Sequence, residues 1–227
     1  MTKKRTQPVP RLHDIVAVVF DLDGVLVDSE PIHFRAANRV LRRYGSSISE
    51  AEYRAFIGLG ETATWEAWRT SSRIPESVAA LVAAHTQARL EEIGAGVDAI
   101  AAAVQLARQL RASGMQLAIA SSSTRQVIDA LLLALELDPV FSVRISGEDP
   151  DVHASKPAPD VYLAAAAQLA VTPAACLAIE DSGPGVISAK RAGMTCIAVP
   201  NRWTADQDFS DADIVLESLR YFPLLVL

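Results

Sequence analysis

The chain has 227 residues, of which 50% are hydrophobic and 21% charged, and its formal net charge at pH 7 is −6. This balance is typical of a globular protein, and the acidic excess argues against a nucleic-acid-binding protein, which would normally show a basic face. The sequence contains no run of about 18 apolar residues, so it predicts no membrane-spanning helix.

The first elements in chain order are a tail and one buried strand. Residues 1–14 are expected to form a flexible tail, because prolines and charged residues interrupt any hydrophobic region of a signal peptide. Residues 15–20 are a continuous apolar run rich in β-branched side chains, which predicts a strand buried on both faces.

A long helical stretch follows this strand. From 30 to 96 the patterns are helical, at 31–44, 49–56, 61–70 and 75–92, and the sequence shows no buried strand between them. We therefore expect an all-α insert of sixty-odd residues, with Gly94 and Gly96 at its return.

Strands and helices alternate beyond the insert. Apolar runs at 115–120, 141–145, 176–179 and 195–199, with a weaker one at 213–216, predict strands. Helical patterns at 97–112, 125–137, 159–169 and 185–192 separate them, and Gly114 and Gly193 stand where helix C-terminal glycines are expected. The alternation predicts a parallel sheet covered on both faces. Cys176 and Cys196 lie in apolar runs and are interpreted as buried thiols of a reducing compartment.

Polar side chains follow four of these strands at the point where each strand ends. They are Asp21 and Asp23 after the first strand, Ser121 to Ser123 after the second, Lys156 after the third, and Glu180 and Asp181 after the fourth. Ligands of open parallel sheets bind outside the carboxyl ends of the strands, so we expect one shared site. An isolated serine there is often only a helix cap, and this alternative stays open for Ser122, Ser123 and Ser182.

Carboxylates gathered at one sheet edge would raise one another's pKa. A hard divalent cation held by oxygen ligands relieves that repulsion, and Mg²⁺ suits a site that combines carboxylates with phosphate. The pattern therefore predicts Mg²⁺ as the cofactor.

Four ordered motifs give the chain a resemblance to the haloacid dehalogenase-like superfamily. They are residues 20–30 (FDLDGVLVDSE), Ser121 after an apolar strand, residues 155–160 (SKPAPD) and residues 180–185 (EDSGPG). The insert is similar to the cap of the subgroup that contains β-phosphoglucomutase and sugar-phosphate phosphatases. The resemblance implies an α/β fold in which a Rossmann-like parallel sheet core, 15–29 and 97–227, carries an inserted all-α helical cap, 30–96.

The resemblance also implies a mechanism. Asp21 would be the nucleophile that forms an aspartyl-phosphate, and Asp23 would protonate the leaving oxygen and then activate the attacking water. Mg²⁺ would be bound by Asp21, the backbone carbonyl of Asp23 and Asp181, with Glu180 as a direct ligand or a support for one. The groups that would hold the phosphoryl oxygens are Ser121, Lys156 and the amide of Leu22.

The cap is expected to select the substrate. His33 corresponds to a position in the phosphoglucomutase group, and a role near the leaving group fits it as well as a plain helix-surface position. Glu61, in the loop 58–61, aligns where the mutase carries an arginine for a second phosphate, which a carboxylate would repel. Ser122 is a further candidate for substrate contact. The sequence thus favours a phosphatase acting on a small phosphomonoester, a sugar phosphate by preference, with a β-phosphoglucomutase-type mutase as the alternative.

A receiver-like phosphoacceptor protein without turnover is a remote second alternative. Receiver domains also gather an aspartate, acidic ligands, a hydroxyl and a lysine, but they are shorter and lack a helical insert. The expected partner is a small phosphorylated metabolite, with no nucleic acid and no membrane. The chain is expected to be cytoplasmic, and a monomer or weak homodimer.

Overall fold

The computed structural model describes residues 14–57 and 60–222, so the predicted tail lies outside the described residues except for Asp14. The strands are β1 (Ala17–Phe20), β2 (Gln116–Ser121), β3 (Val143–Ser146), β4 (Cys176–Glu180), β5 (Thr195–Ala198) and β6 (Ile214–Val215). The helices are α1 (Glu30–Arg42), α2 (Glu50–Arg54), α3 (Glu61–Ser71), α4 (Val78–Ala95), α5 (Ala101–Ala112), α6 (Arg125–Ala134), α7 (Asp160–Gln168) and α8 (Gly183–Arg191), with short 3₁₀ turns η2 (Pro173–Ala175) and η3 (Leu219–Tyr221).

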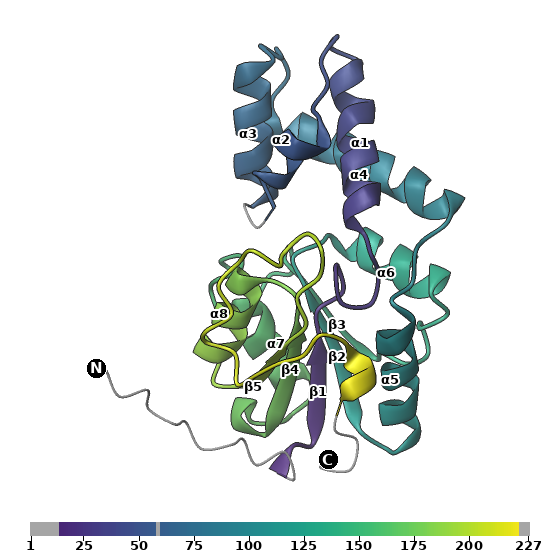
Figure 1. Ribbon diagram of the computed structural model, residues 1–227, viewed down its shortest axis with the longest axis vertical. Coiled ribbons are helices and arrows are strands. Elements are labelled where there is room, and N and C mark those ends of the chain that lie inside the picture. The colour runs from purple at the N-terminus through teal and green to yellow at the C-terminus, as the bar shows by residue number, and fades with distance from the viewer. Residues whose placement is uncertain (1–13, 58–59, 223–227) are drawn as a thin grey trace, which may run out of the picture.

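The six strands form one parallel sheet in the order β3-β2-β1-β4-β5-β6. The chain builds outward from β1 through β2 to β3, then returns to β4 on the other side of β1 and continues to β6. The strand order therefore reverses between β1 and β4, which is the place where ligands bind in sheets of this kind. The predicted α/β fold with an inserted helical cap is confirmed (Figure 1).

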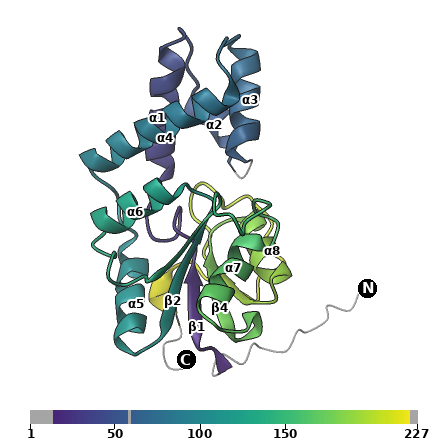
Figure 2. The same cartoon turned by 180° about the vertical axis from the view of Figure 1, so that it is seen from behind.

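The sheet buries an apolar layer on each face. Val18 and Phe20 of β1 belong to the cluster beneath α5 and α6, whereas Ala17 and Val19 belong to the cluster beneath α7 and α8. Figure 2 shows these two helix pairs on opposite sides of the sheet. Because β1 has both faces covered, its sequence is continuously apolar instead of alternating.

Helices α1 to α4 have an apolar cluster of their own. It is built around Trp65 and Trp68, whose rings lie 5.1 Å apart and nearly perpendicular. Trp65 is only 1% exposed. Helix α2 begins with a reciprocal capping box between Ser49 and Glu52. Helix α4 packs against α1 within the cap and against α6 of the core, so the insert rests on the carboxyl edge of the sheet (Figure 1).

The cap joins the core through two neighbouring segments of chain. Val27 and Ala99 form an antiparallel bridge, and the amide of Asp28 donates to the carbonyl of Asp98 at 2.9 Å. Gly96 ends α4 with φ of 135°, a conformation that L side chains rarely adopt. Among the helices in 14–57 and 60–222, none has the length and apolar character needed to cross a membrane.

Candidate active site

Lys156 lies between two acidic residues that come from different strands. Its Nζ is 2.6 Å from Asp21 Oδ1 at the end of β1 and 2.6 Å from Glu180 Oε1 at the end of β4. A third hydrogen bond goes to the carbonyl of Ala120 at 3.1 Å. Burial by itself would lower the pKa of Lys156, but the two carboxylates raise it above its ordinary value, so the lysine is charged.

Glu180 is fully buried, and its carboxylate is surrounded by donors. Tyr162 donates its hydroxyl to Oε1 at 2.7 Å, and Oε2 accepts from the hydroxyl of Ser182 at 3.1 Å and from the amide of Asp181 at 3.1 Å. A Cβ on Gly185 would lie 2.0 Å from the Glu180 carboxyl carbon, so only glycine fits there. Ser182 also caps α8, as the capping interpretation of this serine predicts.

Three acidic residues are placed so that they could hold a metal ion. Asp21, Glu180 and Asp181 are all buried, and each offers an oxygen within 4.8 Å of the others. Burial, followed by repulsion from Glu180, raises the pKa of Asp181, and the pKa of Asp21 is raised chiefly by burial, against the pull of Lys156. A buried oxygen-only donor set with one nearby cation fits a small hard dication such as Mg²⁺.

Asp23 turns toward two serines and the cap. Its Oδ2 accepts from Ser123 Oγ at 2.7 Å and from Ser121 Oγ at 3.3 Å. Its Oδ1 lies 3.5 Å from both Arg89 Nη2 and His33 Nε2. Burial would raise the pKa of Asp23, but the contact with His33 and the charge of Arg89 hold it well below the ordinary value. The carboxyl is therefore ionised in this arrangement.

The remaining candidate residues fall in different places. The side chain of Leu22 is completely buried, and among the described residues its amide has no acceptor, which keeps it available for a ligand. Ser122 is exposed, and no hydrogen bond of its side chain occurs within the described part of the chain. His33 lies beside Asp23 and not on a plain helix surface.

Glu61 faces a partner within the cap. Its Oε1 lies 2.7 Å from His85 Nδ1. Burial would raise the pKa of Glu61, but this contact lowers it below the ordinary value, so the carboxylate is charged. Gly58 and Leu59, which belong to the same predicted loop, lie outside the described residues.

Two functional candidates were missed by sequence reasoning. Arg89 of α4 is 2% exposed, donates to Ser123 Oγ at 3.0 Å, and has an Nε without a partner among the described residues. Asn201, which follows β5, donates to Asp181 Oδ2 at 2.7 Å. The local sequence gives no functional signal for either residue, since Arg89 lies inside a helical pattern and Asn201 follows a proline in an expected turn.

A family comparison agrees with this geometry. A sequence profile described as haloacid dehalogenase-like hydrolase matches residues 18–199. Protein CbbY of Rhodobacter capsulatus is 36% identical over 210 residues, which cover 88% of this chain and 92% of CbbY. Hexitol phosphatase B of Escherichia coli (strain K12) is 35% identical over 213 residues, which cover 90% of this chain and 93% of the phosphatase.

Solved structures of other proteins share the fold of this chain. CbbY from Rhodobacter sphaeroides, crystallised with xylulose-(1,5)bisphosphate, superposes with a TM-score of 0.86 at 28% identity and covers 94% of this chain and 99% of its own. A β-phosphoglucomutase from Clostridium difficile gives a TM-score of 0.78 at 20% identity, covering 93% of this chain and 94% of its own. This second likeness concerns the fold alone.

Proposed function

The chain belongs to the haloacid dehalogenase-like hydrolase family and is a phosphoric monoester hydrolase, and on that premise we propose that it hydrolyses a small sugar phosphate with Mg²⁺ through an aspartyl-phosphate on Asp21. The observation that carries the proposal is the convergence of Lys156, Glu180 and Asp181 on Asp21 where the strand order reverses. The chain covers at least nine-tenths of each of the two curated relatives, which supports carrying their general activity over.

The residues around Asp21 would prepare it for attack on phosphorus. Asp21, Asp181 and the backbone carbonyl of Asp23 would hold Mg²⁺, with Glu180 beside them. The ion, when bound, reduces the repulsion between an anionic nucleophile and an anionic phosphate. Lys156 favours the ionised form of Asp21 through its 2.6 Å contact, against the effect of burial, and would offer its charge to a phosphoryl oxygen. The free amide of Leu22 and the hydroxyl of Ser121 are the further donors.

Asp23 would move a proton on and off the leaving oxygen. The proton it needs for the first step is disfavoured while Arg89 and His33 face its carboxylate. Entry of a substrate hydroxyl or a shift of the cap would draw Asp23 out of these contacts and raise its pKa. In the second step, as a carboxylate, it would take a proton from the attacking water.

A cleft lies between the cap and the core, and one of its residues, Thr124, directly follows Ser123 of the site in sequence. It has a volume of about 730 Å³ and contains residues of α3, α4, the start of α6 and the loop after β3. The polar lining consists of three threonine hydroxyls, two amides, one cation and one carboxylate: Thr62, Thr86, Thr124, Gln87, Gln126, Arg125 and Glu148. The apolar residues Val78, Ala79, Val82 and Ala83 complete the lining. Its hydroxyl and amide groups support a polyhydroxylated leaving group, and hexitol phosphatase B is a relative.

The test is release of inorganic phosphate from a panel of phosphomonoesters that includes hexitol phosphates, hexose phosphates and phosphoglycolate. With Mg²⁺ we expect release, which a chelator and Asp21→Asn each abolish. Asp211→Asn is the matched control, because Asp211 is exposed and takes part in none of the site contacts described above.

Two results would contradict the proposed phosphatase mechanism. Absence of release from every ester would reject it, and retention of the rate by Asp21→Asn would reject Asp21 as the nucleophile. Conversion of β-glucose 1-phosphate to its 6-phosphate without phosphate release would establish the mutase. A cytoplasmic location and a monomeric or weakly dimeric state stay predictions.

A further inference from the structure

The loop that follows β5 contacts the predicted metal site through Asn201. The Nδ2 of this residue donates to Asp181 Oδ2 at 2.7 Å and to the carbonyl of Gly24 at 3.3 Å. Its Oδ1 accepts from the amide of Trp203 at 2.8 Å, which fixes which end of the side-chain amide faces the carboxylate. A Cβ on Gly24 would lie 2.1 Å from Asp181 Oδ2, so the three groups are tightly packed.

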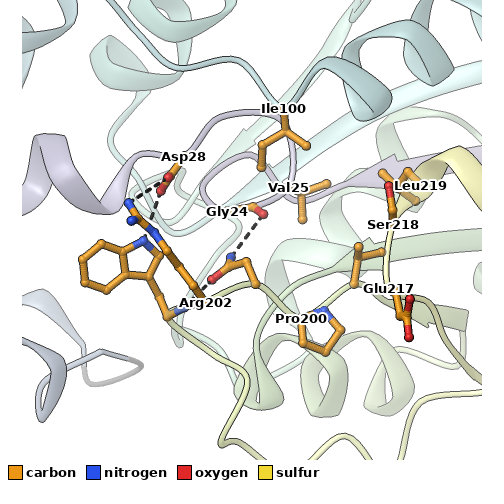
Figure 3. Close-up of a pocket in the computed structure, with 12 residues that line it drawn as sticks. Gly24, Val25, Asp28, Ile100, Pro200, Arg202, Glu217, Ser218 and Leu219 are labelled. Carbon is orange, nitrogen blue, oxygen red and sulfur yellow. Dashed lines mark hydrogen bonds and ion pairs between the residues drawn. The ribbon is translucent and has the colours of Figure 1, made fainter.

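The same loop is bound to Asp28, which lies within the motif at residues 20–30. Trp203 Nε1 donates to Asp28 Oδ1 at 3.1 Å, and Arg202 Nη2 donates to Asp28 Oδ2 at 3.2 Å (Figure 3). Asp28 is also part of the junction with the cap, because its amide is bonded to Asp98. The loop is thereby held against the segment that connects core and cap.

The cap itself reaches this loop through α2. The guanidinium carbon of Arg54 lies 4.4 Å from the ring centroid of Trp203, and its Nη1 donates to the carbonyl of Arg202 at 3.1 Å. The ring of Tyr53 stands perpendicular to that of Trp203 at 6.4 Å. Arg54 is oriented by Glu50, which it contacts at 3.0 Å. A charged group over an indole ring is attracted to its electron-rich face.

We propose that Asn201 and Trp203 form a strap through which the seating of the cap, sensed by Arg54, orients Asp181 for its metal ion. The inference rests on the proposed function, since it takes Asp181 as a ligand of Mg²⁺. Asn201 holds one oxygen of Asp181 and thereby directs the other, and partners of this kind raise the affinity of a ligating residue. Because coupling between two events is reciprocal, Mg²⁺ binding favours the seated cap by the same factor.

The proposed coupling predicts an effect on Mg²⁺ binding that a purely local packing role of Asn201 does not predict. If the side chain of Asn201 only closed its own turn, by accepting from the amide of Trp203, its loss would lower stability and leave the Mg²⁺ affinity unchanged. If the strap acts as proposed, a change at Arg54 on the cap alters Mg²⁺ binding in the core, and it does so only while Asn201 is present.

The experiment is a calorimetric titration of the full-length, substrate-free protein with Mg²⁺. Asn201→Ala and Asn201→Ser are each expected to weaken binding by about tenfold or more, and Arg54→Ala by a smaller factor. In the Asn201→Ala background, Arg54→Ala should cause no further loss. Trp203→Phe, which keeps the ring but loses the donor to Asp28, should fall between wild type and Asn201→Ala.

The control is Arg69→Ala, because Arg69 is also a cap arginine but contacts Glu66 within its own helix. Melting temperatures without metal establish that each variant is folded. Unchanged Mg²⁺ affinity in both Asn201 variants would overturn the strap, as would an equal loss from Arg54→Ala in both backgrounds. Failure of the wild type to bind Mg²⁺ would instead reject the metal site of the proposed function, and the strap with it.

Discussion

Arg89 is a buried cation that the cap extends toward the core. Its Nη2 lies 3.0 Å from Ser123 Oγ and 3.5 Å from Asp23 Oδ1. Taking a guanidinium out of water is costly unless charge and hydrogen bonds offset it, and here the partners belong to the predicted acid–base group. Arg89 therefore links the position of α4 to the protonation of Asp23.

Replacing Arg89 by Met is expected to shift the pH profile of the reaction. The pKa of Asp23 is held down by His33 and Arg89, so losing the guanidinium raises it. Because kcat/KM covers the first step, in which Asp23 must carry a proton, its alkaline limb then moves to higher pH. The plateau falls by about 10- to 100-fold, in line with about 1.5–3 kcal/mol for a hydrogen bond to a charged group.

Arg89→Lys keeps a cation at the same place and should retain most of the wild-type profile. Arg35→Met is the control, since Arg35 pairs with Glu92 on the outside of the cap. An alkaline limb of kcat/KM at the same pH in wild type and Arg89→Met would contradict the assigned contact.

The part of the site that sequence reasoning could anticipate is the part that strand ends define. Asp21, Lys156, Glu180 and Asp181 meet because parallel strands direct their carboxyl ends to one edge. Arg89 belongs to a helix whose sequence does not indicate which side chains face inward. Its partner Ser123 fits the role of a helix N-cap equally well in the sequence. Their contact depends on the position of the cap relative to the core, which no local sequence pattern indicates.

At the scale of elements, α8 and the end of β4 fit together around one glycine. The first turn of α8 brings Gly185 against the Glu180 carboxylate, and Ser182 bonds both. Gly185→Ala is expected to lower the free energy of unfolding by about 1–3 kcal/mol, because the added methyl overpacks a buried site. It should also weaken catalysis, since Glu180 moves and carries Lys156 with it.

Gly94→Ala is the matched control. A Cβ at Gly94 meets nothing within 4 Å and the residue lies inside α4, so this change should be neutral or stabilise by up to about 1 kcal/mol. Both variants can be compared by urea unfolding. Equal stability of Gly185→Ala and wild type would show that the site has room that the structure does not indicate.

Helix ends divide into those that the sequence indicates and those that it does not. Gly114 and Gly193 end α5 and α8 with φ of 88° and 86°, as predicted from glycine alone. Helices α6 and α7 end earlier than their apolar patterns suggest, and there Glu136 and Ala170 adopt φ of 55° and 57°. Tertiary packing of the residues that follow imposes these turns, because neither side chain favours them.

At the scale of the whole molecule, the stability of the metal-free protein should depend on its buried acids. The pKa values of Asp21 and Asp181 are raised above the ordinary 3.8, mainly by burial. A carboxyl whose pKa is higher when folded stabilises the protein fully below 3.8, and this contribution is lost as pH rises through the folded-state value. Mg²⁺ opposes the loss because it binds the ionised form.

The rise in melting temperature on adding Mg²⁺ is therefore expected to be larger at about pH 8 than at about pH 5. Scanning calorimetry with excess Mg²⁺ or chelator at each pH measures it. Asp181→Asn should show little rise at either pH. A rise of the same size at both pH values would mean that these acids are ionised without the metal.

The central position of β1 has a consequence for the newly made chain. Ala17 pairs with Gln116 and with Cys176, so the neighbours of the strand are synthesised about 100 and about 160 residues later. At about 5–20 residues per second, the second edge stays open for on the order of ten to thirty seconds. The helices of the insert are contiguous in sequence and emerge within that interval. An apolar strand with two open edges invites pairing with other chains, so the period of greatest risk of aggregation lasts until β4 has been made.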